Sequence, residues 1–495
     1  MLFMKKFILV LVFLLSLLLI TAGAEESSDT LYFGDFSYII LEDGSAEIVG
    51  TNFTGEILEI PSELDGHVVT SIGDSAFCSC KNIISFTIPD SVTNIGDEAF
   101  FDCDGISTIY IPENVKHIGK GVFGSCYGLK DIQVSPDNKY YTDIKGVLFY
   151  KPEKKLVAFP GAYKYNSYSI PNGISVIEDS AFHSIYSLHS LTIPETVTSI
   201  GNYSFYKCSN LTSVTIPKNV KNIGDFAFAE CESLASLTIG KYVSSIGNAA
   251  FMNCKSLTAV ELPKGLKLIG ESVFEHCDSM TSIIIPDGIT TIGNRAFYKC
   301  LSLANVELPK SVTEIGNSAF SGCESLISIT LSSNVKNIGE SAFSGCKTLV
   351  EFAVPTGITE IKANMFNGCE ALISVTIPSS VTSFGDFSFA YCRALPSITI
   401  PKGITIIGDS IFYNCDSLTS IILPKGITSI GNSAFYSCDI LDSITIPVSV
   451  ENIDSNAFEK CNEVEFVVDR DSYALNWAKE MGIGYSYPDS LDWLK

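Results

Sequence analysis

Residues Leu211 to Ser233 read LTSVTIPKNVKNIGDFAFAECES, and this stretch is one copy of a 23-residue unit. Further copies begin at Leu234, Leu257, Met280, Leu303, Leu326, Leu349, Leu372, Leu395, Leu418 and Leu441. A Phe and a Cys return in step, from Phe205 to Phe458 and from Cys208 to Cys461. A fixed period of this length indicates a stack of similar supersecondary units. The sequence therefore predicts a repeat solenoid.

Each unit is predicted to contain a strand, a break and one short helical turn. In the quoted copy, Val214 and Ile216 flank a polar residue, which is typical of a half-buried strand. Pro217 has no N–H to extend the ladder, so the strand ends there. The following FAFAEC segment is long enough for a helical turn that buries Phe228 and Cys231. Because no unit can bury its apolar residues alone, the units must stack, with parallel strands about 4.8 Å apart.

A glycine precedes the predicted helical turn in thirteen of the sixteen units that carry the Phe. Glu178, Lys362 and Asp454 occupy this position in the other three. The pattern favours a positive φ there without requiring one.

The pattern LxxLxLPxxVxxIGxxAFxxCxx resembles the leucine-rich repeats of the BspA-like bacterial surface-protein family, over about residues 56–470. The resemblance implies an α/β repeat solenoid with a parallel β-sheet on its concave face, short helical turns and a cap at each end. It also implies an adhesin-like protein, secreted or at the cell surface, that binds a host or microbial surface protein or glycan. The periodicity itself predicts only the solenoid.

The chain divides into four predicted regions. Residues 1–24 have the features of a signal peptide, namely Lys5-Lys6, an apolar run from Phe7 to Ile20 and a small-residue cleavage site. An uncleaved anchor is the alternative, and no second membrane-spanning run follows. Residues 25–66 are predicted to form an N-terminal β cap, with a hairpin around residues 42–45. Residues 67–463 form the solenoid.

Two segments are expected to depart from the repeat. At 131–166 the period is interrupted by a predicted β-hairpin insertion, with strands at 146–150 and 156–159, that is rich in lysine. Residues 464–495 are predicted to form a C-terminal cap with a helix from Tyr473 to Met481. Asp471 or Ser472 is expected to cap this helix, Gly482 to end it and Trp477 to cover the last repeat.

The composition is acidic, with a net charge of −23 that becomes −25 without Lys5 and Lys6. Such a charge argues against nucleic acid and against anionic membrane surfaces as partners. A simpler explanation is that it keeps a long repeat protein soluble.

Fifteen of the sixteen cysteines occupy one position of the repeat, and Cys78 is the exception. Neighbouring Cβ atoms about 4.8 Å apart exceed the disulfide norm of about 3.8 Å, so the ladder cysteines are predicted to be free and buried. Cys78 is expected to be exposed. A spacing of 23 residues provides no CxxC pair and the five histidines do not cluster, so neither a metal site nor a cofactor is predicted.

The strand position of Thr215 is Thr in many units, and its neighbours depart from this pattern in the middle of the array. A recognition patch is therefore predicted there, with repeat drift as the alternative explanation. Its residues are Glu261, Ile284, Asn305, Glu307 and Glu351. A second candidate surface is the aromatic edge that follows the buried Phe, although packing along the edge would also explain it. Its residues are Tyr206, Tyr298, Tyr413 and Tyr436.

Three functions were weighed from these features: an adhesin-like binding protein, a structural spacer or coat component without a specific ligand, and a glycan hydrolase. Glu261 and Glu307 would lie roughly 10 Å apart, which is the outer limit for an inverting glycosidase. No apolar pocket that would raise the pKa of a catalytic acid is evident. The sequence therefore favours a binding protein over an enzyme.

Overall fold

The computed structural model describes residues 30–488 of the 495-residue chain. The signal peptide predicted for residues 1–24 lies outside the described residues. Two compact units are present, residues 30–152 with 158–163, and residues 153–157 with 164–488. Each is described by itself.

The first unit begins with an antiparallel hairpin that leads into stacked repeats. Strand β1 (Leu31–Phe33) pairs with β2 (Phe36–Ile40), and β2 pairs with β3 (Ala46–Thr51) across the turn that the sequence predicts. The sheet continues with parallel strands β6 (His67–Ile72), β8 (Asn94–Ile95) and β10 (His117–Ile118). Short strand β5 (Glu63–Leu64) folds back on β6, and the Tyr38 hydroxyl donates to Asp65 at 2.7 Å in the connecting turn.

The other strands of the first unit form two parallel pairs and one hairpin. The parallel pairs are β4 (Ile57–Glu59) with β7 (Ser85–Thr87), and β9 (Thr108–Ile111) with β11 (Asp131–Val134). Within the insertion, the hairpin joins β12 (Tyr141–Ile144) to β13 (Val147–Tyr150). The sequence did not predict β12 as the partner of β13. Strand β14 (Lys155–Ala158), most of which belongs to the second unit, pairs in parallel with β16 (Val176–Ile177) through Lys155 and Leu156.

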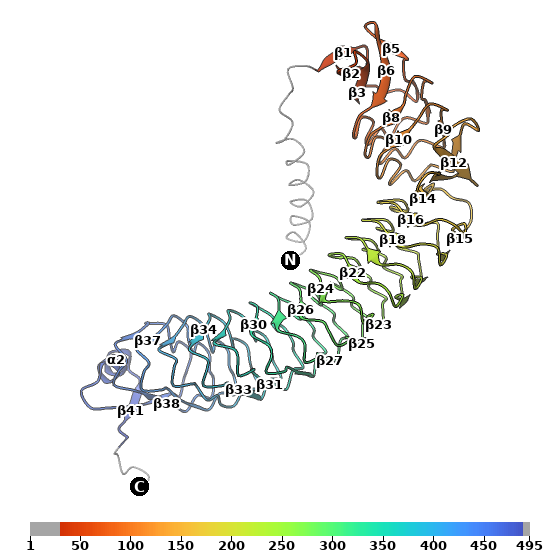
Figure 1. Ribbon diagram of the computed structural model, residues 1–495. Coiled ribbons are helices and arrows are strands. Elements are labelled where there is room, and N and C mark those ends of the chain that lie inside the picture. The colour runs from red at the N-terminus through yellow and green to blue at the C-terminus, as the bar shows by residue number, and fades with distance from the viewer. Residues whose placement is uncertain (1–29, 489–495) are drawn as a thin grey trace. The chain divides into compact units, whose positions relative to one another are not determined.

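The second unit is an array of parallel strands in two sets, which follow opposite edges of the array in Figure 1. The first set has mostly three-residue strands whose outer residues are exposed and whose middle residue is buried; we call the exposed side of this set the strand face. Its members are β15 (Ser167–Ser169), β17 (Ser190–Thr192), β19 (Ser213–Thr215), β21 (Ser236–Thr238), β23 (Ala259–Glu261), β25 (Ser282–Ile284), β27 (Asn305–Glu307), β29 (Ser328–Thr330), β31 (Glu351–Ala353), β33 (Ser374–Thr376), β36 (Ser420–Ile422), β38 (Ser443–Ile446) and β40 (Glu465–Val468).

The second set consists of two-residue strands that follow a turn which contains Pro in most repeats. These are β16 (Val176–Ile177), β18 (Ser199–Ile200), β20 (Asn222–Ile223), β22 (Ser245–Ile246), β24 (Leu268–Ile269), β26 (Thr291–Ile292), β28 (Glu314–Ile315), β30 (Asn337–Ile338), β32 (Glu360–Ile361), β34 (Ser383–Phe384), β35 (Ile406–Ile407), β37 (Ser429–Ile430) and β39 (Asn452–Ile453). Both sets advance by 23 residues per turn, as in the pairs Glu261↔Ile284 and Ile292↔Ile315. The parallel solenoid predicted from the period is therefore confirmed.

The segment predicted to be a helical turn is not a helix. In the repeat around Phe297, N–H groups bond to carbonyls three residues earlier, from Tyr298 to Arg295 and from Cys300 to Phe297. Arg295 and Lys299 have left-handed backbones, with φ of 52° and 56°. The N–H groups of Arg295, Phe297 and Lys299 bond to carbonyls of the next repeat at 2.8–2.9 Å. These bonds between repeats replace the i to i−4 bonds of a helix, so the segment is a ladder of reverse turns.

The repeated glycine before this segment is required by close packing and not by a positive φ. A Cβ added to Gly316 would lie 2.6 Å from the Asn294 nitrogen and 2.7 Å from the Gly293 carbonyl carbon. No positive φ accompanies this glycine. Lys362 replaces the glycine directly after β32. Strand β32 is not paired to β30, the equivalent strand of the preceding repeat. Glu178 and Asp454 follow β16 and β39, which are paired to their predecessors, so a side chain at this position is costly there without being excluded.

A column of stacked phenylalanines fills the core. Phe297 is fully buried and stacks on Phe274 and Phe320, with ring centroids 5.7 and 5.2 Å away. Beside it, each ladder thiol from Cys103 onward donates to a Phe carbonyl 26 residues earlier, as from Cys300 to Phe274 at 3.1 Å. The ladder cysteines are free, as predicted, but Cys80 and Cys461 near the ends of the ladder are half-buried and not fully buried as expected. Cys78 is half-buried, whereas the sequence suggested an exposed thiol.

The helix predicted near the C-terminus is present with the predicted bounds. Helix α2 (Tyr473–Met481) begins after Ser472, whose hydroxyl accepts from the Leu475 N–H, and ends at the left-handed Gly482. Trp477 is buried and stacks on Phe466 of β40, with ring centroids 5.7 Å apart. Strand β41 (Gly484–Ser486) pairs in parallel with β40.

Candidate functional site

Three of the predicted patch residues lie in one column of the strand face. Glu261, Ile284 and Glu307 are the third residues of β23, β25 and β27, and each is exposed. Glu261 pairs in register with Ile284, and Glu307 with Thr330. Ile284 has 61% of its surface exposed, so an aliphatic side chain is exposed to solvent between the Glu261 and Glu307 carboxylates.

The other two patch residues belong to the neighbouring column. Asn305 and Glu351 are the first residues of β27 and β31, and they pair with Ser328 and Ser374. The Ser328 hydroxyl lies 3.5 Å from the Asn305 Oδ1 atom. The structure thus places all five residues on one exposed face, in two columns, because a strand of three residues exposes its first and third side chains.

A hollow of about 510 Å³ opens beside Glu261, between β21 and β23. Its walls include Thr238, Ile239, Lys241, Pro263 and Lys264. We call it the Glu261 hollow. The hollow was not predicted from the sequence, although Gly240 was a signal that could have indicated it, because most repeats have Pro at this position. The hollow adds two ammonium groups to a surface that the sequence predicted from its carboxylates.

The four tyrosines of the second candidate surface do not form one continuous strip. Each is half-buried, and each belongs to a local cluster. Tyr206 donates to Glu230 at 2.8 Å, and burial together with this hydrogen bond raises the pKa of its hydroxyl. Tyr413 and Tyr436 stack with centroids 4.6 Å apart, and Lys460 lies over Tyr436. Packing along the edge therefore accounts for these side chains.

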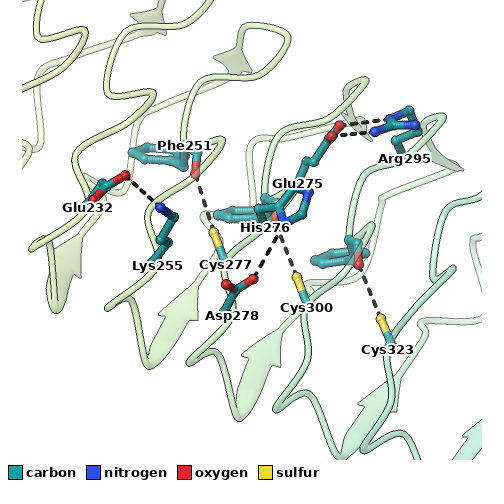
Figure 2. A network of polar contacts seen from close by, with 12 residues as sticks. Glu232, Phe251, Lys255, Glu275, His276, Cys277, Asp278, Arg295, Cys300 and Cys323 are labelled. Atoms are coloured by element: carbon teal, nitrogen blue, oxygen red, sulfur yellow. Dashed lines mark hydrogen bonds and ion pairs between the residues drawn. The ribbon is translucent and has the colours of Figure 1, made fainter. Parts of the chain in front are cut away.

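Tyr298 belongs to the most extensive of these clusters, part of which is shown in Figure 2. The Arg295 guanidinium lies 4.0 Å from the Tyr298 ring centroid and makes two hydrogen bonds to Glu275, at 2.9 and 2.5 Å. Burial opposes ionisation of Glu275, but the hydrogen bonds from Arg295 and Ser272 hold its pKa below the ordinary value. Burial and the Lys299 charge lower the pKa of His276, which lies 3.6 Å from Asp278. The cluster fixes the edge of two repeats.

The geometry provides no assembled catalytic or metal centre in the part of the chain that the structure describes. Ile284 separates Glu261 from Glu307 in their column, and both carboxylates face outward. Within residues 30–488, no three His, Cys, Asp or Glu side chains converge as metal ligands would. No helix among these residues has the length and apolar character needed to cross a membrane. The candidate site is thus an exposed surface with carboxylates, one aliphatic side chain and two nearby ammonium groups.

Comparison with known proteins supports the fold. The chain is similar to a leucine-rich repeat protein from Bacteroides ovatus, with 26% identity and a TM-score of 0.58 over 88% of this chain and 99% of that one. A leucine rich cell surface protein from Faecalibacterium prausnitzii is 24% identical, with a TM-score of 0.39 over 95% of this chain and 97% of that one. No curated protein matches the sequence.

The family model of the BspA type leucine rich repeat region matches four overlapping stretches, residues 57–161, 155–281, 267–395 and 359–473. Together they include the strand face, the Glu261 hollow and the turn ladder. The resemblance seen in the repeat pattern is thereby confirmed. The chain belongs to the BspA-type leucine-rich repeat family.

Proposed function

We propose that this chain is a secreted or cell-surface binding protein, adhesin-like, that recognises a host or microbial surface protein or glycan through its strand face. The observation that carries the proposal is the column Glu261, Ile284 and Glu307, where three successive repeats replace the usual Thr. An exposed isoleucine between carboxylates contributes little to the buried core, so its presence is better explained by contact with a partner. Family membership supports display at or beyond the cell surface.

The proposal is tested by probing the purified full chain against an array of matrix proteins and glycans. A triple variant, Glu261→Thr, Glu307→Thr and Glu351→Thr, replaces the three carboxylates of the candidate patch by the hydroxyl side chain that is common on the strand face. A matched variant, Glu314→Thr, Glu340→Thr and Glu370→Thr, removes the same charge from exposed positions of the same unit outside the strand face. Saturable binding that only the first variant loses is the expected result.

Two other outcomes would contradict the proposal in different ways. Binding that survives the first variant would place recognition elsewhere, on the tyrosine clusters or the lysine-rich insertion. Absence of binding to any component of the array would favour a structural spacer or coat component without a specific ligand.

A further inference from the structure

The Glu261 hollow exists because one repeat leans toward its predecessor. Most repeats have Pro at the position of Gly240, as at Pro217 and Pro263. A Cβ on Gly240 would lie 2.1 Å from the Pro217 oxygen and 2.8 Å from the Lys218 Cα. The backbone of this turn therefore rests directly on the preceding repeat, at a distance that only glycine permits.

This displacement opens space on the other side of the turn. In the described sheets β21 does not pair with β23, whereas β19 pairs with β21 and β23 with β25. Ile239 is half-buried, although its counterparts Ile216 and Leu262 are 1% and 3% exposed. The hollow thus has an aliphatic floor, whereas the equivalent residues of the two neighbouring repeats are covered.

Two lysines, Lys241 and Lys264, line this hollow, and a third precedes them by one repeat. Lys218, Lys241 and Lys264 follow the Pro/Gly position in three successive repeats; we call them the lysine row. All three are exposed, and none forms an ion pair with any residue of the described chain. On a chain with a net charge of −23, this is a local reversal of sign that attracts anions.

We propose that the Glu261 hollow and the lysine row bind an acidic glycan, a linear polysaccharide with carboxylates spaced along the chain; the proposal deepens the proposed function and rests on it. Lys241 and Lys264 pair with a sugar carboxylate. Thr238 and Glu261 face sugar hydroxyls. These hydroxyls donate hydrogen bonds to the Glu261 carboxylate, which can only accept them. Ile239 and Pro263 contact the apolar face of a sugar ring, and the exposed ring of Tyr242 stands beside Lys241.

Charge density distinguishes this partner from other polyanions. Duplex DNA carries one negative charge per about 1.7 Å of its axis. Glu261 and the net negative charge of the protein would strongly repel such a densely charged polymer. They would repel a uronate polymer, with one carboxylate per disaccharide, far less. The small hollow with two ammonium groups and one carboxylate therefore fits a sparsely charged, hydroxyl-rich chain.

The test is titration of the full chain with hyaluronate, with dextran as the uncharged control. The variant Lys241→Ser with Lys264→Ser should weaken binding at least tenfold. A matched variant, Lys402→Ser with Lys425→Ser, changes exposed lysines at the same repeat position beside Pro401 and Pro424, and should bind as the wild type does. Gly240→Pro restores the usual residue of the repeat and should also weaken binding, since the hollow closes while both lysines remain.

Equal losses in the two lysine variants would overturn the proposal, because they would indicate non-specific attraction. Tighter binding of single-stranded DNA or of phosphatidylglycerol vesicles than of hyaluronate would assign the surface to another polyanion and also overturn it. Failure to bind hyaluronate, together with array binding that the Glu261, Glu307 and Glu351 variant loses, would reject the acidic glycan while leaving the proposed function intact.

Discussion

Replacing Gly316 by alanine tests whether the repeated glycine is dictated by contact between successive backbones. Its new Cβ would meet three main-chain or Asn294 side-chain atoms at 2.6–2.7 Å, and real Cβ contacts are not found below 3.0 Å. Main-chain atoms cannot rotate away, so the two repeats must separate locally. Overpacking of this kind costs about 1–3 kcal/mol.

Two other glycines of the same unit provide matched controls. At Gly426 the nearest atoms to an added Cβ lie 3.8 Å away and φ is not positive, so alanine should stabilise by about 0.4–1 kcal/mol. At Gly408, which directly follows β35, a strand that is not paired to the preceding β34, the close contact is a single side-chain oxygen of Asp386 at 2.7 Å. Gly408→Ala should therefore fall between the two.

The assay is urea unfolding of the full chain, combined with native-state hydrogen exchange, because a repeat array opens locally as well as globally. Gly316→Ala should be less stable than Gly426→Ala by at least about 1.4 kcal/mol. Amides next to position 316 should exchange faster than those next to 426. Equal stability of these two variants would refute the close-packing explanation. Asp454, which occupies the same position in a paired repeat, shows that the cost is finite.

Three further predictions concern ionisable groups of the repeats. Iodoacetamide should modify Cys461 before the buried ladder thiols, because Cys461 is only half-buried and its hydrogen bond with Cys438 lowers its pKa. Peptide mapping of the native chain checks the order of modification. The Glu275–Arg295 pair should stabilise the folded chain at pH values above the ordinary Glu pKa, and this contribution should be lost as the pH falls through the lowered pKa of folded Glu275. Arg295→Met should lower the free energy of unfolding by about 1–3 kcal/mol at neutral pH, as measured by urea titration. Burial and the Lys207 charge lower the pKa of His183 to about 4, so stability should decline as pH falls from about 6.5 toward 4, and a His183→Gln variant that retains the whole decline would contradict this assignment.

Much of the fold could be predicted because the repeat constrains each residue many times. Pro217, Phe228 and Cys231 recur with the same spacing, and one unit therefore accounts for the strand, its end and the buried column. The helix after Ser472 also followed from local rules, since its cap, apolar face and terminal glycine are all close in sequence. Local signals and a fixed period were sufficient for these elements.

The turn ladder could not be predicted from one unit, because its hydrogen bonds go to the next repeat. The same holds for the side-chain ladder in which Asn294 Oδ1 accepts from the Asn317 N–H at 2.9 Å. The sequence shows Asn or Asp at this position of most repeats but not where the side-chain oxygen points. Interactions between repeats thus decide between helix and reverse turns, although the composition of the segment suits both.

The candidate site was predicted in part. Departures from the Thr column correctly identified exposed residues, since strand alternation fixes the orientation of Glu261, Ile284 and Glu307. The hollow beside Glu261 depends on how far Gly240 moves toward Pro217, which is a property of packing. The lysine row was visible in the sequence, but only the structure shows that two of its members line that hollow.

The most direct test of recognition by the strand face is carboxylate footprinting of the full chain, with and without a saturating ligand from the array. Modification of Glu261 and Glu307 should fall when ligand is bound. Glu314 and Glu370, which are exposed outside the strand face, should be modified equally in both samples. Unchanged modification of Glu261 and Glu307 under saturating ligand, with protection at Glu314 or Glu370 instead, would contradict the account.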